Sequence, residues 1–168
     1  MDDPFELLGI EPVFELDPST LQAQFLSASA RCHPDRFTDP LEQADAADRM
    51  SRVTQAYRQL SDPESRAHAL LALRGDSADT EGEATKALPP DLLMEMMEVR
   101  EALDDAIALG DQPSIEKHRD WAQQKQADYL TSIGKLFEEP PSEQNSAAIR
   151  LELNALRYMV RMLEQMPA

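Results

Sequence analysis

The sequence predicts an all-α fold, in which a helical hairpin with short flanking helices precedes a bundle of three helices. Apolar residues recur at every third or fourth position along several segments, which is the spacing of one helix face. Only 5 of the 168 residues are glycine and aromatic residues make up 5 %, whereas helix-favouring alanine, leucine and glutamate are common. No segment has the alternating pattern of a β-strand.

The charge of the chain narrows its possible partners. Residues 1–80 contain 15 acidic and seven basic residues, and residues 81–168 contain 17 and nine, so each half carries −8 of the net charge of −16. Nucleic acids and anionic membrane surfaces bind proteins through lysine and arginine, so we expect neither as a partner. No apolar run reaches membrane-spanning length. The acidic residues 1–4 resemble neither a signal nor a transit peptide, which favours the cytoplasm.

The residues that bind metals are sparse. Cys32 is the single cysteine, so an internal disulfide and a thiolate metal site are both excluded. His33, His68 and His118 lack the spacing of metal ligands. The chain also lacks glycine-rich phosphate loops and nucleophile motifs. We therefore expect no cofactor and no metal.

The first half reads as a hairpin of two long helices. A short helix over residues 4–8 precedes Asp17-Pro18, a cap-then-proline start, and the helix that follows ends at Pro34. A second long helix runs from Leu41 to Asp62-Pro63, where a short helix begins. The expected stripes are Leu21, Phe25, Ala28 and Cys32 on the first long helix, and Ala47, Met50, Val53, Tyr57 and Leu60 on the second.

The second half reads as three antiparallel helices. The polar, aperiodic residues 76–90 are interpreted as a linker between a first domain, residues 1–75, and a second, residues 91–168. Helices are expected over about 91–109, 113–137 and 146–166, and their short connections favour a bundle. The expected core stripes are Leu92, Met96, Val99, Leu103 and Ile107 on the first helix, and Ile149, Leu153, Leu156, Val160 and Leu163 on the third.

The most informative motif is His33-Pro34-Asp35, which lies in the loop of the hairpin. The second long helix then ends in a run from Ala56-Tyr57 through Leu60 and Asp62-Pro63 to Arg66. Residues 5–75 resemble the J-domain of the DnaJ superfamily, in which a His-Pro-Asp loop and the run Ala-Tyr-x-x-Leu-x-Asp-Pro-x-x-Arg are the two signatures.

The resemblance implies a protein partner. J-domains dock on DnaK-type chaperones and stimulate their ATPase, so His33, Pro34, Asp35, Arg31 and Arg36 become the candidate chaperone-binding residues. A carboxylate such as Asp35 can pair with an arginine of a partner, and His33 at a helix C-terminus suits a donor or cation. The alternative is purely local, with Asp35 capping the next turn and His33 capping carbonyls.

The helix before the motif departs from the family pattern. J-domains usually carry a basic face there, and in this chain Arg31 is the only cation on that helix. Three arginines of the next helix, Arg49, Arg52 and Arg58, are candidates to supply the missing charge. We expect weaker electrostatic steering than is usual for the family.

Two further blocks resemble the HscB family, which serves iron–sulfur cluster assembly. Residues 66–75 are similar to its Arg-Ala-x-x-Leu-Leu-x-Leu-x-Gly, and residues 92–104 to its Leu-Met-Glu-x-x-Glu-x-Arg-Glu-x-Leu block. Three large apolar residues of the second block fall outside the core stripe and are expected at the surface. The candidate scaffold-binding residues are Leu93, Met94, Met97, Glu98 and Glu101, with Tyr158 added by the resemblance.

The resemblance implies a co-chaperone that delivers an IscU-type scaffold to the chaperone HscA or to DnaK, without binding a cluster itself. Two alternatives stay open. The second domain can bind another client, or His33 and Asp35 can form the acid–base pair of an enzyme, which requires a concave pocket and further titratable groups around them.

Overall fold

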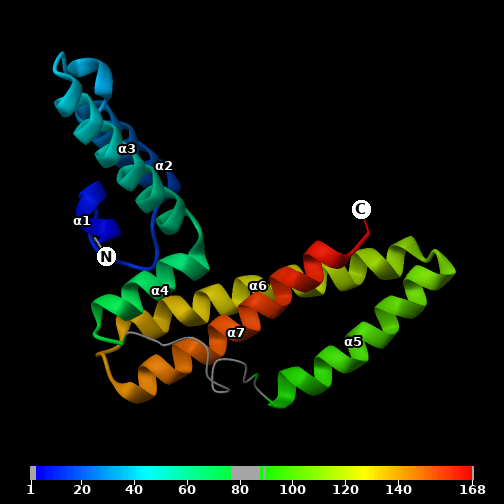
Figure 1. Cartoon of the computed structure of the whole chain (residues 1–168). Helices are drawn as coiled ribbons and strands as arrows, with labels where there is room; N and C mark the ends of the chain where they lie inside the picture. Colours follow the sequence, from blue (N-terminus) through cyan, green and yellow to red (C-terminus); the bar gives the residue numbers. More distant parts are fainter. Residues whose placement is uncertain (1–2, 77–87, 89, 168) are drawn as a thin grey trace. The chain divides into compact units, whose positions relative to one another are not determined.

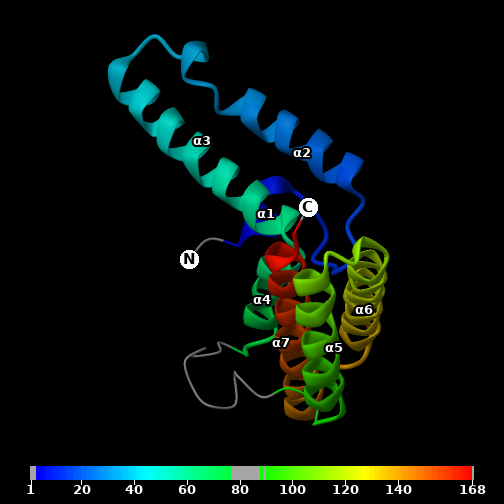
Figure 2. The ribbon, with the colours of Figure 1, turned by 90° about the vertical axis from the view of Figure 1, so that its right-hand side faces the viewer.

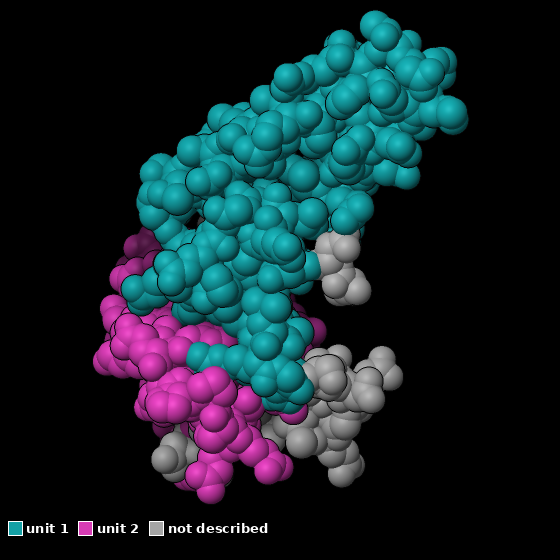
Figure 3. All heavy atoms as spheres, turned by 90° about the vertical axis from the view of Figure 1, so that its left-hand side faces the viewer, with its two compact units in different colours: residues 1–77 teal, residues 78–168 magenta. Residues whose placement is uncertain are grey.

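The computed structural model describes residues 3–76, 88 and 90–167, and every regular element in these ranges is helical. This confirms the all-α fold class. The chain divides into two compact units, residues 1–77 and 78–168 (Figure 3). Most of the expected linker, residues 76–90, lies outside the described residues. Within the described part, no helix is both long and apolar enough to cross a membrane.

The first unit is built on a helical hairpin. Its elements are α1 (Pro4–Leu8), α2 (Pro18–Arg31), the 3-10 helix η1 (Pro34–Arg36), α3 (Pro40–Ser61) and α4 (Pro63–Leu73). The helices α2 and α3 lie side by side and run in opposite directions, and α1 packs against both (Figures 1 and 2). The hairpin therefore presents the η1 loop at its far tip.

Aspartate followed by proline begins every α-helix of this unit. The aspartate side chain accepts a backbone N–H of the first turn, and the proline needs no partner for a nitrogen that carries no hydrogen. The caps are Asp3, Asp17, Asp39 and Asp62. Hydrogen bonds from the Ser19 and Thr20 side chains lower the pKa of Asp17 to about 2. Because Asp39 caps it, α3 begins at Pro40, one residue before the expected Leu41.

The facing stripes of the hairpin agree with the expectation except at one position. Leu21 and Ala28 of α2 and Cys32, the residue that follows it, are buried, and the ring of Phe25 stacks on Tyr57 of α3 with 4.4 Å between centroids. On α3, however, Ala46 is buried and the expected Ala47 is exposed. Position 46 lies seven residues, or about two helical turns, before Val53, so the two side chains lie on the same face of α3.

The second unit contains three longer helices. They are α5 (Pro90–Leu109), α6 (Gln112–Glu138) and α7 (Glu143–Gln165). The start of α7 lies three residues before the expected Ser146, because Ser142 caps the helix through the Asn145 N–H. The buried Asn145 amide also donates to the Leu136 carbonyl at 2.9 Å, which ties this start to the end of α6.

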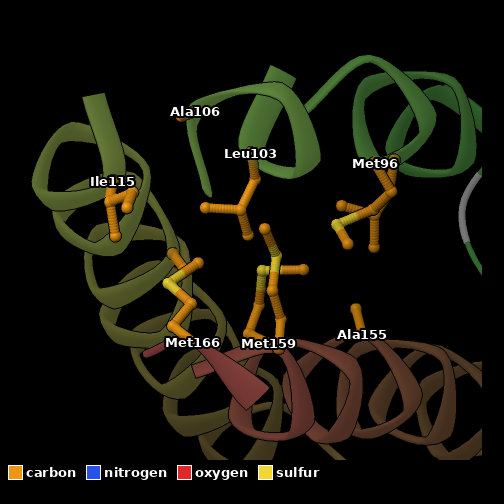
Figure 4. Close-up of a cluster of buried hydrophobic side chains, with 10 residues drawn as sticks. Met96, Leu103, Ala106, Ile115, Ala155, Met159 and Met166 are labelled. Carbon is orange, nitrogen blue, oxygen red and sulfur yellow. The ribbon is translucent and has the colours of Figure 1, made fainter. Parts of the chain in front are cut away.

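Methionines fill much of the core between these helices (Figure 4). In the close-up, Met96 and Leu103 of α5 point toward Ala155 and Met159 of α7, with Met166 just beyond the end of α7 and Ile115 of α6 beside them. Unbranched methionine adapts to irregular gaps, so it suits a core in which three helices cross. The core is thus shared by all three helices of the unit.

Two predicted core stripes were wrong at their C-terminal ends. On α5, Ile107 is 42 % exposed and Ala106 takes its place in the core. On α7, Val160 is only partly buried and Met159 takes its place; Leu163 is partly buried and packs against the core beside the buried Met162. In both helices the prediction placed the next core residue four positions along the chain, whereas the buried residue lies three positions along. Both spacings are close to the 3.6 residues of one helical turn, so the sequence pattern alone does not distinguish them.

A polar cluster joins α5 to α6 on one flank of this core. The carboxylate of Glu95 accepts a hydrogen bond from Trp121 Nε1 at 3.2 Å and forms an ion pair with Lys125 Nζ at 2.7 Å. The Lys125 ammonium also lies 5.6 Å from the Trp121 ring centroid. Glu95 thereby helps to fix the rotation of α5, and with it the face that α5 turns to solvent.

We predict that Glu95→Ala lowers the unfolding free energy of this unit by about 1 kcal/mol, a discounted value because the three side chains are partly exposed. Glu95→Gln should cost less, because the amide oxygen still accepts from Trp121. Urea unfolding followed by the fluorescence of Trp121, the single tryptophan, measures the effect. Glu98→Ala, at an exposed position one turn away, is the control and should change the free energy by less than about 0.5 kcal/mol. Equal midpoints for Glu95→Ala and the control would show that the cluster does not hold α5.

Candidate functional site: the hairpin tip and the exposed face of α5

The tip of the hairpin is a tight turn set by Pro34. The α2 helix ends at Arg31, and His33 is extended, with φ −68° and ψ 127°, as a residue before proline prefers. The next three residues form η1, and the Arg36 N–H donates to the His33 carbonyl at 3.1 Å. The Gln43 side chain of α3 donates to the Phe37 carbonyl at 2.8 Å. The motif is therefore held in a defined loop.

His33 acts inside this loop as an acceptor. Its Nδ1 accepts the Asp35 N–H at 3.3 Å, so the imidazole caps η1. We expected His33 to act as a donor or cation at the carbonyl groups that end α2, and this was wrong. Because the backbone of His33 is extended, its ring contacts η1 instead. An Nδ1 that accepts carries no proton, which places the proton of the neutral ring on Nε2.

The Asp35 carboxylate projects into solvent. Its side chain is 90 % exposed, and its oxygen lies 3.7 Å from His33 Nδ1, too far for a hydrogen bond. The cap of the following α3 helix is supplied by Asp39 instead. This geometry suits a carboxylate that binds a group outside the chain.

The two candidate arginines of the tip have different local roles. Arg36 Nη1 donates to the Ala30 carbonyl at 3.0 Å, so this cation closes the C-terminal end of α2. Arg31 Nη1 donates to Ser27 Oγ one turn earlier at 3.1 Å. Sequence reasoning missed the contact between Arg36 and Ala30, because it depends on the fold-back that η1 produces.

The exposed face of α5 carries the large apolar residues of the second candidate site. Leu93, Met94 and Met97 are 51 %, 68 % and 69 % exposed. Glu98 and Glu101 are exposed too, and positions 94, 97, 98 and 101 share one helix face because they lie three, four and seven residues apart. Tyr158, on α7, is 37 % exposed, next to the buried Met159. An apolar patch beside carboxylates has the composition of a protein-binding surface.

The acid–base alternative requires a concave pocket and further titratable groups around His33 and Asp35. A pocket of about 300 Å³ between α1, α2 and α3 is lined by Arg31 and Cys32, among others, and by neither His33 nor Asp35. In the described ranges, no group of three histidine, cysteine or acidic residues is placed to hold a metal ion.

Comparisons with known proteins agree on the family of both units. Residues 3–69 match the DnaJ domain, and residues 88–166 match the HscB C-terminal oligomerisation domain. A co-chaperone HscB homologue of Ralstonia nicotianae is 37 % identical over 138 residues, which cover 80 % of this chain and 77 % of that protein. The homologue of Aliivibrio salmonicida is 34 % identical over 141 residues, covering 83 % and 80 %.

Two solved structures of HscB proteins resemble this chain over nearly its whole length. Chaperone HscB from Vibrio cholerae aligns with a TM-score of 0.79 and 27 % identity over 98 % of this chain and 95 % of that one. Human co-chaperone HscB aligns with a TM-score of 0.81 and 24 % identity over 99 % and 81 %, which supports the fold alone. A J-domain whose tip carries His33-Pro34-Asp35, followed by an HscB C-terminal domain, places this chain in the HscB family of co-chaperones.

Proposed function

We propose that this co-chaperone stimulates ATP hydrolysis by a chaperone ATPase of the HscA or DnaK type, and that it delivers an IscU-type iron–sulfur scaffold to that chaperone. In this proposal the first unit, about residues 1–75, docks on the chaperone and the second, about residues 91–168, holds the scaffold. The iron–sulfur cluster travels on the scaffold, and the protein works in the cytoplasm as an adaptor without a cofactor.

The observation that carries the proposal is the exposed Asp35 carboxylate on a fixed turn. Its side chain is 90 % exposed, and the backbone beneath it is held by the His33 and Arg36 contacts. A carboxylate presented this way can form a charge-assisted pair with an arginine of the chaperone. The Nε2 proton of His33 provides a second donor beside it. Because the turn is formed before binding, little ordering is needed on docking.

The scaffold assignment rests on the exposed face of α5. Apolar side chains that are more than half exposed are potential anchors for a partner, and flexible methionine adapts to its surface. Glu98 and Glu101 provide a polar rim. We propose that Tyr158, which lies on α7, contributes to the same scaffold-binding surface. The alternative is another client for the same surface, and binding of purified IscU distinguishes the two.

We predict that His33→Gln and Asp35→Asn each reduce ATPase stimulation at least about tenfold. Asp35→Asn leaves an arginine of the chaperone unpaired in the desolvated interface, and His33→Gln removes the donor at the position of the imidazole Nε2. The glutamine oxygen can still accept the Asp35 N–H, so the turn should persist. Asp39→Asn is the matched control: it alters an exposed aspartate of the same loop that caps α3, and asparagine caps equally well. The measurement is the steady-state ATPase rate of the chaperone. Stimulation by either variant at the level of the control would refute the role of the motif.

We predict that replacing Leu93, Met94 and Met97 together with alanine removes most of the affinity for IscU, at least about tenfold, and leaves ATPase stimulation without scaffold unchanged. Stability should change little, because surface substitutions usually cost less than about 0.5 kcal/mol each. Met159→Ala is the contrasting variant. Its side chain is 0 % exposed, so it should lower stability by about 2–5 kcal/mol.

Thermal melting and IscU binding of the same samples test this prediction. A triple variant that melts like Met159→Ala would place the three residues in the core. A triple variant that melts normally and binds IscU fully would move the scaffold site elsewhere.

A further inference from the structure

The first two turns of α5 are apolar on almost every side. Residues 92–97 read Leu-Leu-Met-Glu-Met-Met, so Glu95 is the single polar residue among these consecutive positions. Of the apolar side chains in this segment, those of Leu92 and Met96 are buried and the others are more than half exposed. Consecutive residues lie about 100° apart around a helix axis, so the segment surrounds the axis completely. Hydrophobicity alone therefore does not define which face of these two turns lies against the core.

The core that receives these turns does not define the face either. Residues 155–166 contribute mainly methionine and alanine to it, namely Ala155, Met159, Met162 and Met166. Flexible methionine fills gaps of different shapes and specifies its neighbours poorly. From Glu98 to Asp105, in contrast, charged residues separate the apolar ones, so that half of α5 has a defined face. The first two turns need a further constraint, and it must depend on direction.

Glu95 provides contacts of this kind. Its Oε1 accepts a hydrogen bond from Trp121 Nε1 at 3.2 Å, and its Oε2 pairs with Lys125 Nζ at 2.7 Å. Trp121 and Lys125 lie four residues apart on α6, so one face of that helix holds both carboxylate oxygens. The Lys125 ammonium lies 5.6 Å from the Trp121 ring centroid, which keeps the two partners together. Hydrogen bonds weaken with misalignment, so a rotation of α5 that moves Glu95 breaks both contacts.

We propose that Glu95, held by Trp121 and Lys125, is a positioning residue that keeps the apolar scaffold-binding side chains of α5 turned toward solvent. This role rests on the proposed function, because it concerns binding of the IscU-type scaffold. Without Glu95, the first two turns exchange buried and exposed apolar side chains with little change in burial. Only part of the population then presents the binding face, and the apparent affinity falls in proportion to that part. Scaffold affinity is therefore more sensitive to Glu95 than stability is.

The first test separates positioning from stability. Glu95→Leu makes residues 92–97 wholly apolar and should weaken IscU binding about tenfold, the loss expected if about a tenth of the chains present the binding face. Ile149→Val is the matched control, because it trims a fully buried side chain of α7 and lowers the urea midpoint while Glu95 stays in place. Its affinity should change less than about twofold. Wild-type affinity in Glu95→Leu, or an equal loss in Ile149→Val, would overturn the proposal.

A variant of α6 distinguishes positioning from direct contact between Glu95 and the scaffold. Lys125→Met removes the ion pair and should weaken IscU binding less than Glu95→Leu does, because the hydrogen bond from Trp121 remains. In the double variant, Lys125→Met should add nothing to the loss caused by Glu95→Leu, since both changes act on one contact. Fully additive losses would show that Lys125 acts independently of Glu95, which contradicts a positioning role.

The exposure of the methionines gives a readout that needs no scaffold. Hydrogen peroxide converts methionine to its sulfoxide, and peptide mass spectrometry of the full chain gives the rate at each position. In the wild type, Met94 and Met97 should react before the buried Met96. In Glu95→Leu the three rates should converge, and an unchanged order would overturn the proposal. If the wild-type chain does not bind IscU, the scaffold assignment is refuted, and the methionine rates still decide whether Glu95 sets the rotation of α5.

Discussion

The ring of Pro34 is the constraint on which the hairpin tip depends. It stops α2 and forces His33 into an extended conformation. From there the chain closes the η1 turn, His33 caps it, and the Asp35 carboxylate points outward. Arg36 then reaches back to the Ala30 carbonyl and Asp39 starts α3. In the sequence these side chains look like one functional cluster. In the structure most of them build the turn, and one, the Asp35 carboxylate, is exposed on it.

In the second unit, the rotation of a helix determines which side chains are exposed, as the turn does in the first unit. Methionine occurs on both sides of α5: Met96 is buried in the shared core, and Met94 and Met97 are exposed. The chemistry of the three side chains is the same, so only the rotation of the helix separates core from surface. The contacts of Glu95 with Trp121 and Lys125 stabilise that rotation from the flank. A polar cluster beside an apolar core thus helps to define which residues a partner can reach.

Local signals were predictable from the sequence, and tertiary details were not. Asp17-Pro18 and Asp62-Pro63 marked helix starts because capping involves residues two or three apart. The exposure of Leu93, Met94 and Met97 followed from the correct phase of α5 around Leu92 and Met96. Phase errors accumulated toward Ile107 and Val160, since steps of three and four residues both fit a stripe. The His33 contact with Asp35 and the Arg36 contact with Ala30 could not be foreseen, because they depend on the path of the loop.

The arginines of the first unit divide into two groups according to what surrounds their guanidinium groups. A net charge of −16 gives a long-range repulsion from other acidic molecules, but salt screens it beyond about 8 Å under physiological conditions. Inside that distance the local cations dominate. Arg36 and Arg66 are directed to the carbonyls of Ala30 and Leu60, so they stabilise the fold. Arg31, Arg49 and Arg52 line one pocket together with apolar residues. Under the function proposed above, docking of this unit therefore depends on short-range contacts made at the tip after encounter.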